Sequence, residues 1–126
     1  MKRTILLLLL PLALAGCVSY RTSSDGIARA RLGETVAVDG PRVTPLKVLE
    51  DSRCPANVQC VWAGQVRLSI RIDLGSGSET REIVSNKPLP VADGTLTLVE
   101  VMPAKKADQP LYPEEYRFGF KFAGGI

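Results

Sequence analysis

Apolar and polar residues alternate with a period of two along much of this chain, which is typical of β-strands. The clearest run is Val66 to Leu74, where every even position is apolar and every odd position is polar. Such a strand has one face in a core and the other in water. Tyr116 to Phe122 repeats the pattern with aromatic residues at the even positions, so we expect both sets to share one core.

Turn residues separate these strands from shorter ones. Asp39-Gly40 lies between two apolar runs, 35–38 and 43–49, and predicts a tight hairpin. Gly75-Ser76-Gly77 predicts a second hairpin, which leads into a weaker strand over residues 79–84.

One further strand is expected over residues 95–101. Its apolar set shifts from Leu96 and Leu98 to Val99 and Val101, which indicates a β-bulge. The whole pattern predicts an all-β fold, either a small antiparallel sandwich or a partly closed barrel.

The N-terminus carries a different pattern. Lys2 and Arg3 precede an apolar core over residues 5–15, which is too short to be a permanent membrane span and is typical of an export signal. The core ends in Leu14-Ala15-Gly16-Cys17, which resembles the bacterial lipobox. The alternative is an ordinary secretory signal that is cleaved beside a cysteine.

The lipobox resemblance implies that residues 1–16 are removed and that Cys17 receives lipid, palmitate included. Two or more acyl chains suffice for stable anchoring. Val18 is not the aspartate associated with inner-membrane retention, so the resemblance implies the outer membrane, facing the periplasm, in a Gram-negative cell. The expected location is therefore the bacterial cell envelope.

Removal of 16 residues from 126 leaves 110, enough for one domain. We expect a flexible tether over residues 17–32, rich in Ser, Thr, Arg and Gly, and a single β-domain over residues 33–126. Without Lys2 and Arg3 the 16 basic residues become 14 against 13 acidic ones. This near-neutral balance argues against nucleic-acid binding.

The chain has three cysteines and no histidine. Once Cys17 carries lipid, Cys54 and Cys60 remain as an even pair in an exported segment, where disulfides persist. The alternatives are free thiols or metal ligands, but two thiols without histidine supply too few ligands for a zinc or copper site. We therefore expect a disulfide, no metal and no cofactor.

The stretch from Asp51 to Gly64 holds both of these cysteines and the only tryptophan. Its D-S-R-C-P and C-V-W-A-G segments, four residues apart, resemble a signature of short exported bacterial proteins and lipoproteins. The resemblance covers the β-domain and implies no particular activity. Opposite charges on Asp51 and Arg53 predict a local ion pair, and Trp62 shares a parity with Cys60, so the indole could cover the disulfide.

Two interpretations of this loop remain open. In the functional one, a stiff loop presents binding residues to a partner, since a preorganised loop loses less entropy on binding. In the structural interpretation, the loop closes an open end of the sheet, Trp62 fills the core as a plug, and Arg53 serves as scaffolding that holds the local structure. The long irregular stretch over residues 103–113 is either a second binding or capping element or a solvated connector. The candidate binding residues are Arg53, Asn57, Val58, Gln59 and Trp62.

Catalysis has little support in the sequence. Without histidine no Ser-His-Asp or Cys-His arrangement exists, and no spacing selects a pair of carboxylates. The hypotheses are a non-enzymatic, membrane-anchored envelope lipoprotein that binds an envelope protein or glycan, and an inhibitor of a lysozyme or protease that acts through the disulfide loop. A purely structural spacer, which needs no concave patch, is a third.

Overall fold

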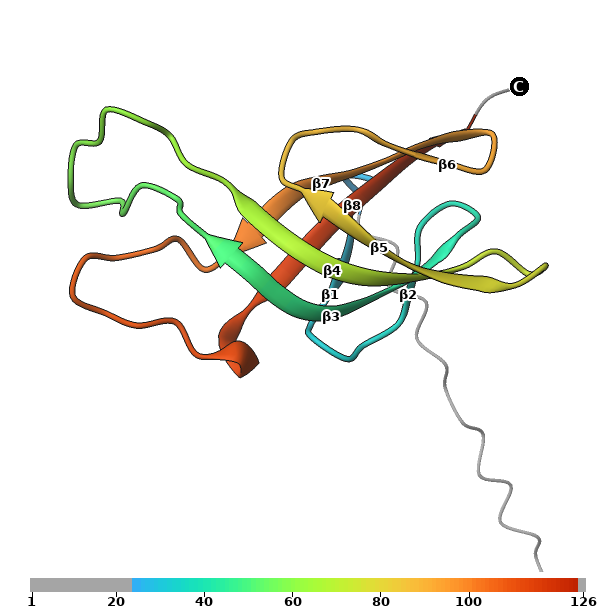
Figure 1. Ribbon diagram of the computed structural model, residues 1–126, viewed down its shortest axis with the longest axis horizontal. Coiled ribbons are helices and arrows are strands. Elements are labelled where there is room, and N and C mark those ends of the chain that lie inside the picture. Colours follow the sequence, from blue (N-terminus) through green and yellow to red (C-terminus); the bar gives the residue numbers. More distant parts are fainter. Residues whose placement is uncertain (1–23, 125–126) are drawn as a thin grey trace, which may run out of the picture.

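Two antiparallel sheets make up the part of the chain that the structure, a computed structural model, describes, residues 24–124 (Figure 1). The strands are β1 (Ala28–Ala30), β2 (Val36–Ala37), β3 (Arg42–Asp51), β4 (Val66–Asp73), β5 (Ser78–Val84), β6 (Leu89–Val91), β7 (Gly94–Met102) and β8 (Arg117–Gly124). A 3-10 turn, η1 (Pro113–Glu115), precedes β8. The export signal and Cys17 lie outside the described residues.

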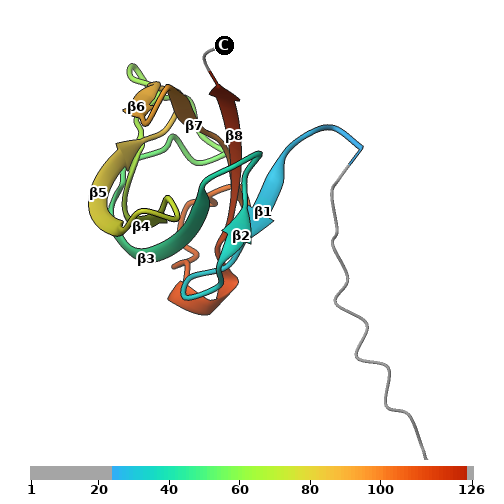
Figure 2. The ribbon, with the colours of Figure 1, turned by 90° about the vertical axis from the view of Figure 1, so that its right-hand side faces the viewer.

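The sheets have the strand orders β1-β8-β7-β6 and β2-β3-β4-β5. Figure 2 shows β3, β4 and β5 curving along one side of the molecule while β6, β7 and β8 lie on the other. The sheets pack face to face and do not close into a barrel. The predicted all-β class is confirmed, and of the two predicted architectures the sandwich is the correct one.

The core lies between the sheets and consists of the residues that the alternating pattern selected. On β4 the even positions from Val66 to Ile72 have no exposed surface, and on β8 the same holds for Phe118 and Phe120. The Tyr116 ring stacks on Phe118 with the ring centroids 5.5 Å apart. Burial of each such side chain contributes about 1.5–3 kcal/mol to stability.

The predicted turns and the β7 bulge are also confirmed. Val36 pairs with Val43 across the Asp39-Gly40 turn. Leu74 N–H donates to the Gly77 carbonyl in the turn between β4 and β5. The pairing of β7 with β8 shifts register between Leu98 and Glu100, where the apolar phase changes along the sequence.

The sandwich begins earlier than the expected boundary at Gly33. Residues 28–30, which we assigned to the tether, form β1 and pair with β8 from Phe118 to Phe120. Ala30 is buried, and Arg29 forms ion pairs with Asp25 and Glu100. A strand of three residues, with only the small apolar side chains of Ala28 and Ala30, is too short to produce a visible alternation, which explains the error.

Strand β3 contains two irregularities that the sequence analysis did not detect. Its pairing with β4 shifts register between Pro45 and Lys47 and again between Val48 and Glu50. Each shift leaves one extra residue, Leu46 or Leu49, without a partner on β4. The two leucines are 44% and 43% exposed.

Two long connections extend from the same end of the sandwich (Figure 1). The disulfide loop (residues 52–65) joins β3 to β4, and the β7–η1 loop (residues 103–112) leads towards β8. We call these two loops together the loop end. Strand β1 runs antiparallel to β8 and therefore towards the loop end, so the chain enters the sandwich from the opposite side.

Candidate functional site

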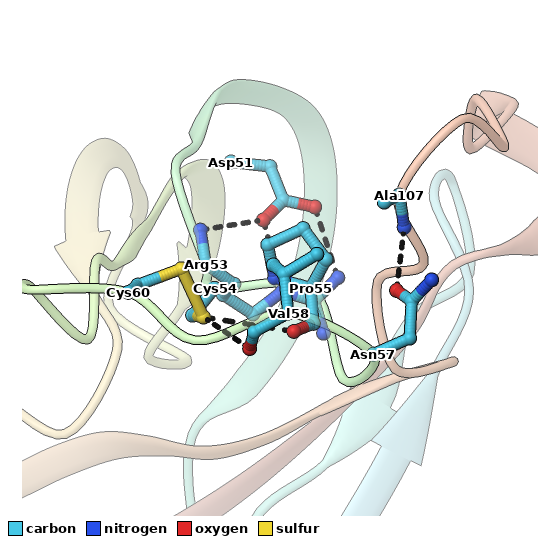
Figure 3. Close-up of a disulfide and its surroundings, with 8 residues drawn as sticks. All are labelled: Asp51, Arg53, Cys54, Pro55, Asn57, Val58, Cys60 and Ala107. Carbon is cyan, nitrogen blue, oxygen red and sulfur yellow. Dashed lines mark hydrogen bonds and ion pairs between the residues drawn. A yellow bond between two sulfur atoms is a disulfide. The ribbon is translucent and has the colours of Figure 1, made fainter.

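An ion pair stands at the base of the disulfide loop, as the sequence predicted. Asp51, the last residue of β3, accepts hydrogen bonds from Arg53 Nε and Nη2, both at 2.9 Å (Figure 3). The side chains are only 9% and 19% exposed. A bidentate contact of this kind fixes the direction in which the chain leaves β3.

The Arg53 side chain also reaches the other sheet. Its Nη1 donates to the carbonyls of Val101 and Pro103, at 2.9 and 3.0 Å, at the end of β7. Every nitrogen of this guanidinium therefore has a partner within the domain. We predicted Arg53 as a binding residue, but these contacts give it the scaffolding role.

Two further residues join this cluster, and the sequence analysis assigned neither of them to it. Lys105 Nζ donates to the Asp51 carbonyl at 2.7 Å, and the Tyr116 hydroxyl donates to Asp51 Oδ2 at 2.8 Å. Both lie more than 50 positions along the chain from Asp51, as their separations of 54 and 65 show. No local pattern reports contacts at such separations.

The cluster changes the protonation of its members. Burial alone would raise the pKa of Asp51, but hydrogen bonds from Arg53 and Tyr116 and the charge of Arg53 outweigh it and lower the pKa. Burial, together with the hydrogen bond to Asp51 and its negative charge, raises the pKa of Tyr116 to about 12. Asp51 is therefore a carboxylate and Tyr116 a neutral donor across the ordinary pH range.

The predicted disulfide between Cys54 and Cys60 is present, with the two Cα atoms 5.9 Å apart. Within the segment that it closes, Val58 N–H donates to the Pro55 carbonyl at 3.2 Å. Below it, Cys54 N–H donates to the Ala63 carbonyl and Ser52 N–H to the Gln65 carbonyl. The two arms of the loop are thus joined by the disulfide and by backbone hydrogen bonds below it.

Gly64 lets these arms approach each other. Its φ is +70°, and a Cβ at this position would overlap the backbone carbonyl of Ser52. Only glycine fits both conditions without displacing the backbone.

The disulfide loop and the β7–η1 loop are also bonded to each other. Ala56 N–H donates to the Lys105 carbonyl at 2.8 Å. Ala107 N–H donates to Asn57 Oδ1 at 2.9 Å (Figure 3). The β7–η1 loop therefore supports its neighbour and is not a simple solvated connector.

The tip of the disulfide loop carries the remaining predicted binding residues. Asn57, Val58 and Gln59 are all exposed. Trp62 is 82% exposed and Val61 is 90% exposed, so the interpretation of Trp62 as a core plug over the disulfide is wrong. The parity argument failed because residues 61–64 do not form a strand.

A hollow of about 220 Å³ lies along the side of the sandwich at β3. Its lining residues come from the β1–β2 connection, from the bulged part of β3, and from η1 with the residue that follows it: Leu32, Leu46, Lys47, Val48, Pro113 and Tyr116. The sequence analysis missed this hollow. The available signal was the spacing of Val43, Pro45, Val48 and Asp51, which departs from a period of two.

Between residues 24 and 124, no group of three or more His, Cys, Asp or Glu side chains is placed to hold a metal ion. The same part of the chain contains no helix with the length and hydropathy to cross a membrane.

Comparisons with known proteins found no match to this chain among family models, curated proteins or solved structures.

Proposed function

We propose that this chain is an exported, non-enzymatic binding module, anchored to a bacterial membrane by lipid on Cys17, that docks on an envelope protein or glycan through its loop end. One observation carries the proposal: the loop end is stiffened by a disulfide and an ion pair, yet Asn57, Val58, Gln59 and Trp62 remain exposed. Stiff loops with exposed side chains lose little entropy on binding.

The chain direction is consistent with an anchor at Cys17. Because β1 runs towards the loop end, its first residue, Ala28, lies farther from that end than its last residue, Ala30. A membrane on the side where β1 begins would leave the loop end directed away from its surface. The hollow beside β3 is a feature that a purely structural spacer does not need.

The anchor has a direct test in cells. Metabolic labelling with palmitate should mark the wild-type protein, and Cys17→Ser should abolish the label and leave unprocessed precursor. Continued labelling of Cys17→Ser would refute lipidation at this residue.

Docking through the loop end is tested by photo-crosslinking in the native envelope. A photoreactive amino acid replaces Gln59 at the loop tip in one variant and the exposed Thr80 on β5 in the other. We expect a discrete adduct from position 59 that is absent from position 80 and lost in the Cys54→Ala/Cys60→Ala variant. Equal adducts from both positions, or none from position 59, would contradict the proposal.

The second candidate function is inhibition of a lysozyme or protease by the same loop. It is favoured by the exposure of three consecutive residues, Asn57 to Gln59, on a loop closed by a disulfide. An inhibitor of this kind should titrate its enzyme at one-to-one stoichiometry, and Val58→Asp should weaken the inhibition. Activity assays with excess protein against lysozyme and against serine and cysteine proteases decide this point.

A further inference from the structure

Trp62 is a large apolar side chain without an apolar neighbour to cover it. It is 82% exposed, and Val61 beside it is 90% exposed. The loop beneath them is held by the disulfide, by Gly64 and by the bonds between its arms. Since a stiff loop cannot fold back to bury the indole, burial of Trp62 requires another molecule.

The hollow beside β3 is the complementary feature of the same chain. Leu46, Val48, Leu32 and Pro113 give it apolar walls, and Lys47 stands in its lining. The Tyr116 hydroxyl is held by Asp51, which fixes the ring that forms one of these walls. The hollow is therefore preformed.

We propose that a second copy of this chain inserts its Trp62 indole into this hollow, and that the first copy does the same in return. The sizes match: a cavity of roughly 150 Å³ binds benzene, and scaling to the nine ring atoms of indole gives about 225 Å³. The hollow measures about 220 Å³. Most of the lining is apolar, which suits the apolar body of an indole.

Reciprocal insertion gives a closed pair. Each copy has one exposed indole and one hollow, so a two-fold arrangement uses both and leaves neither open for further growth. A buried aromatic side chain covers about 150–250 Å², so two indoles and the surfaces that receive them stay below the roughly 1,200 Å² of a standard interface. We therefore infer a weak, reversible dimer with a dissociation constant in the micromolar range.

This inference names one partner of the loop and rests only on the part of the proposed function that makes the loop a docking element. It does not depend on the envelope partner. Anchoring in a membrane would favour a weak dimer, because confinement to a surface raises the effective concentration of the two copies.

Self-association is tested with purified protein. Both sheets lie within residues 28–124, so a chain that starts at residue 18 keeps the whole sandwich and lacks the lipidation site. Sedimentation velocity from about 5 to 500 μM should show a monomer becoming a dimer, as expected for a weak interface. Since Trp62 is the only tryptophan, its fluorescence emission should shift to shorter wavelength over the same concentrations.

Variants identify the contact. Trp62→Ala and Leu46→Glu should each weaken association at least about tenfold, because each removes one half of both contacts. Leu49→Glu is the matched control, since Leu49 has the same exposure as Leu46 but does not line the hollow, and it should leave association unchanged.

Mixing the two defective variants gives the sharpest outcome. Trp62→Ala keeps an intact hollow and Leu46→Glu keeps an intact indole, so the mixed pair regains one of the two contacts. It should associate more tightly than either variant alone and more weakly than the wild type. The emission of Leu46→Glu should then shift on addition of Trp62→Ala.

A wild-type protein that stays monomeric with unchanged emission, an assembly larger than a dimer, or undiminished association of Trp62→Ala would overturn the inference. None of these results affects the crosslinking test at position 59, so failure of the dimer and failure of the proposed function are distinguishable.

Discussion

Phe118 and Phe120 between the sheets have no exposed surface, whereas Trp62 and Val61 at the tip of the disulfide loop are 82% and 90% exposed. Apolar burial holds the sheets together, and the part of the chain from 24 to 124 leaves no buried polar side-chain atom without a partner. At the loop end a disulfide, an ion pair and backbone hydrogen bonds fix the structure instead. The exposed apolar residues of the loop are not part of the core that stabilises the fold, so they are available for binding.

The largest effect is expected in the sheet core. Phe118→Ala should lower the free energy of unfolding by about 3–5 kcal/mol, because a cavity adds to the lost transfer free energy. Lys121→Ala, on the exposed face of the same strand, should change it by about 0.5 kcal/mol or less. Urea melts of both variants test this, and equal losses would refute the two-faced description of β8.

Gly64→Ala tests the close approach of the two arms of the disulfide loop. The new Cβ would overlap the Ser52 carbonyl at a φ of +70°, and we expect a loss of about 3 kcal/mol. Gly75→Ala is the matched control, because Gly75 has a φ of +78° but open space around it, and it should cost only about 1 kcal/mol. If thermal melts give the same loss for both, the close approach of the two arms is not important.

Removal of the disulfide should have a smaller effect. For the loop from Cys54 to Cys60, the chain-entropy relation gives about 2.4 kcal/mol, so Cys54→Ala/Cys60→Ala should remain folded with an intact core. Circular dichroism should retain the strand signal while urea melts shift to lower denaturant. A variant that does not fold at all would show that the loop end is part of the folding core.

Tyr116→Phe should give the smallest of these losses, about 1.5 kcal/mol, because it removes one hydrogen bond to a charged acceptor. The dependence of this stability loss on pH tests the environment of Tyr116 more specifically than the size of the loss does. The pKa of Tyr116 is about 12 in the folded protein and 10.0 without the fold, so its stabilisation is complete below pH 10 and lost as the pH rises towards 12. The advantage of the wild type over Tyr116→Phe in urea melts should therefore shrink between pH 10 and 12, and a constant difference would contradict the assigned environment.

The sequence predicted the core well and the loop end only in part. Burial on a strand imposes an alternation that can be read locally, and this identified the even positions of β4 and β8. The Asp51–Arg53 pair and the disulfide are local too. Lys105 and Tyr116 join the cluster through the packing of the two sheets, which no local pattern reports.

The errors have the same origin. The exposure of Trp62 was missed because parity arguments hold only in strands, and residues 61–64 leave the strand conformation. The hollow is lined by three separate segments that meet there, one of which includes the first bulge of β3, at Leu46. Its existence is a property of the assembled sandwich.

We infer that the disulfide loop is as rigid as the sheets although its tip is exposed. Backbone ¹⁵N relaxation measures this directly, since order parameters near about 0.85 mark rigid backbone and values below about 0.6 mark flexible backbone. We expect residues 54–64 to match β4 in the oxidised protein and to fall after reduction of the disulfide. Order parameters below about 0.6 in the oxidised loop would contradict the claim.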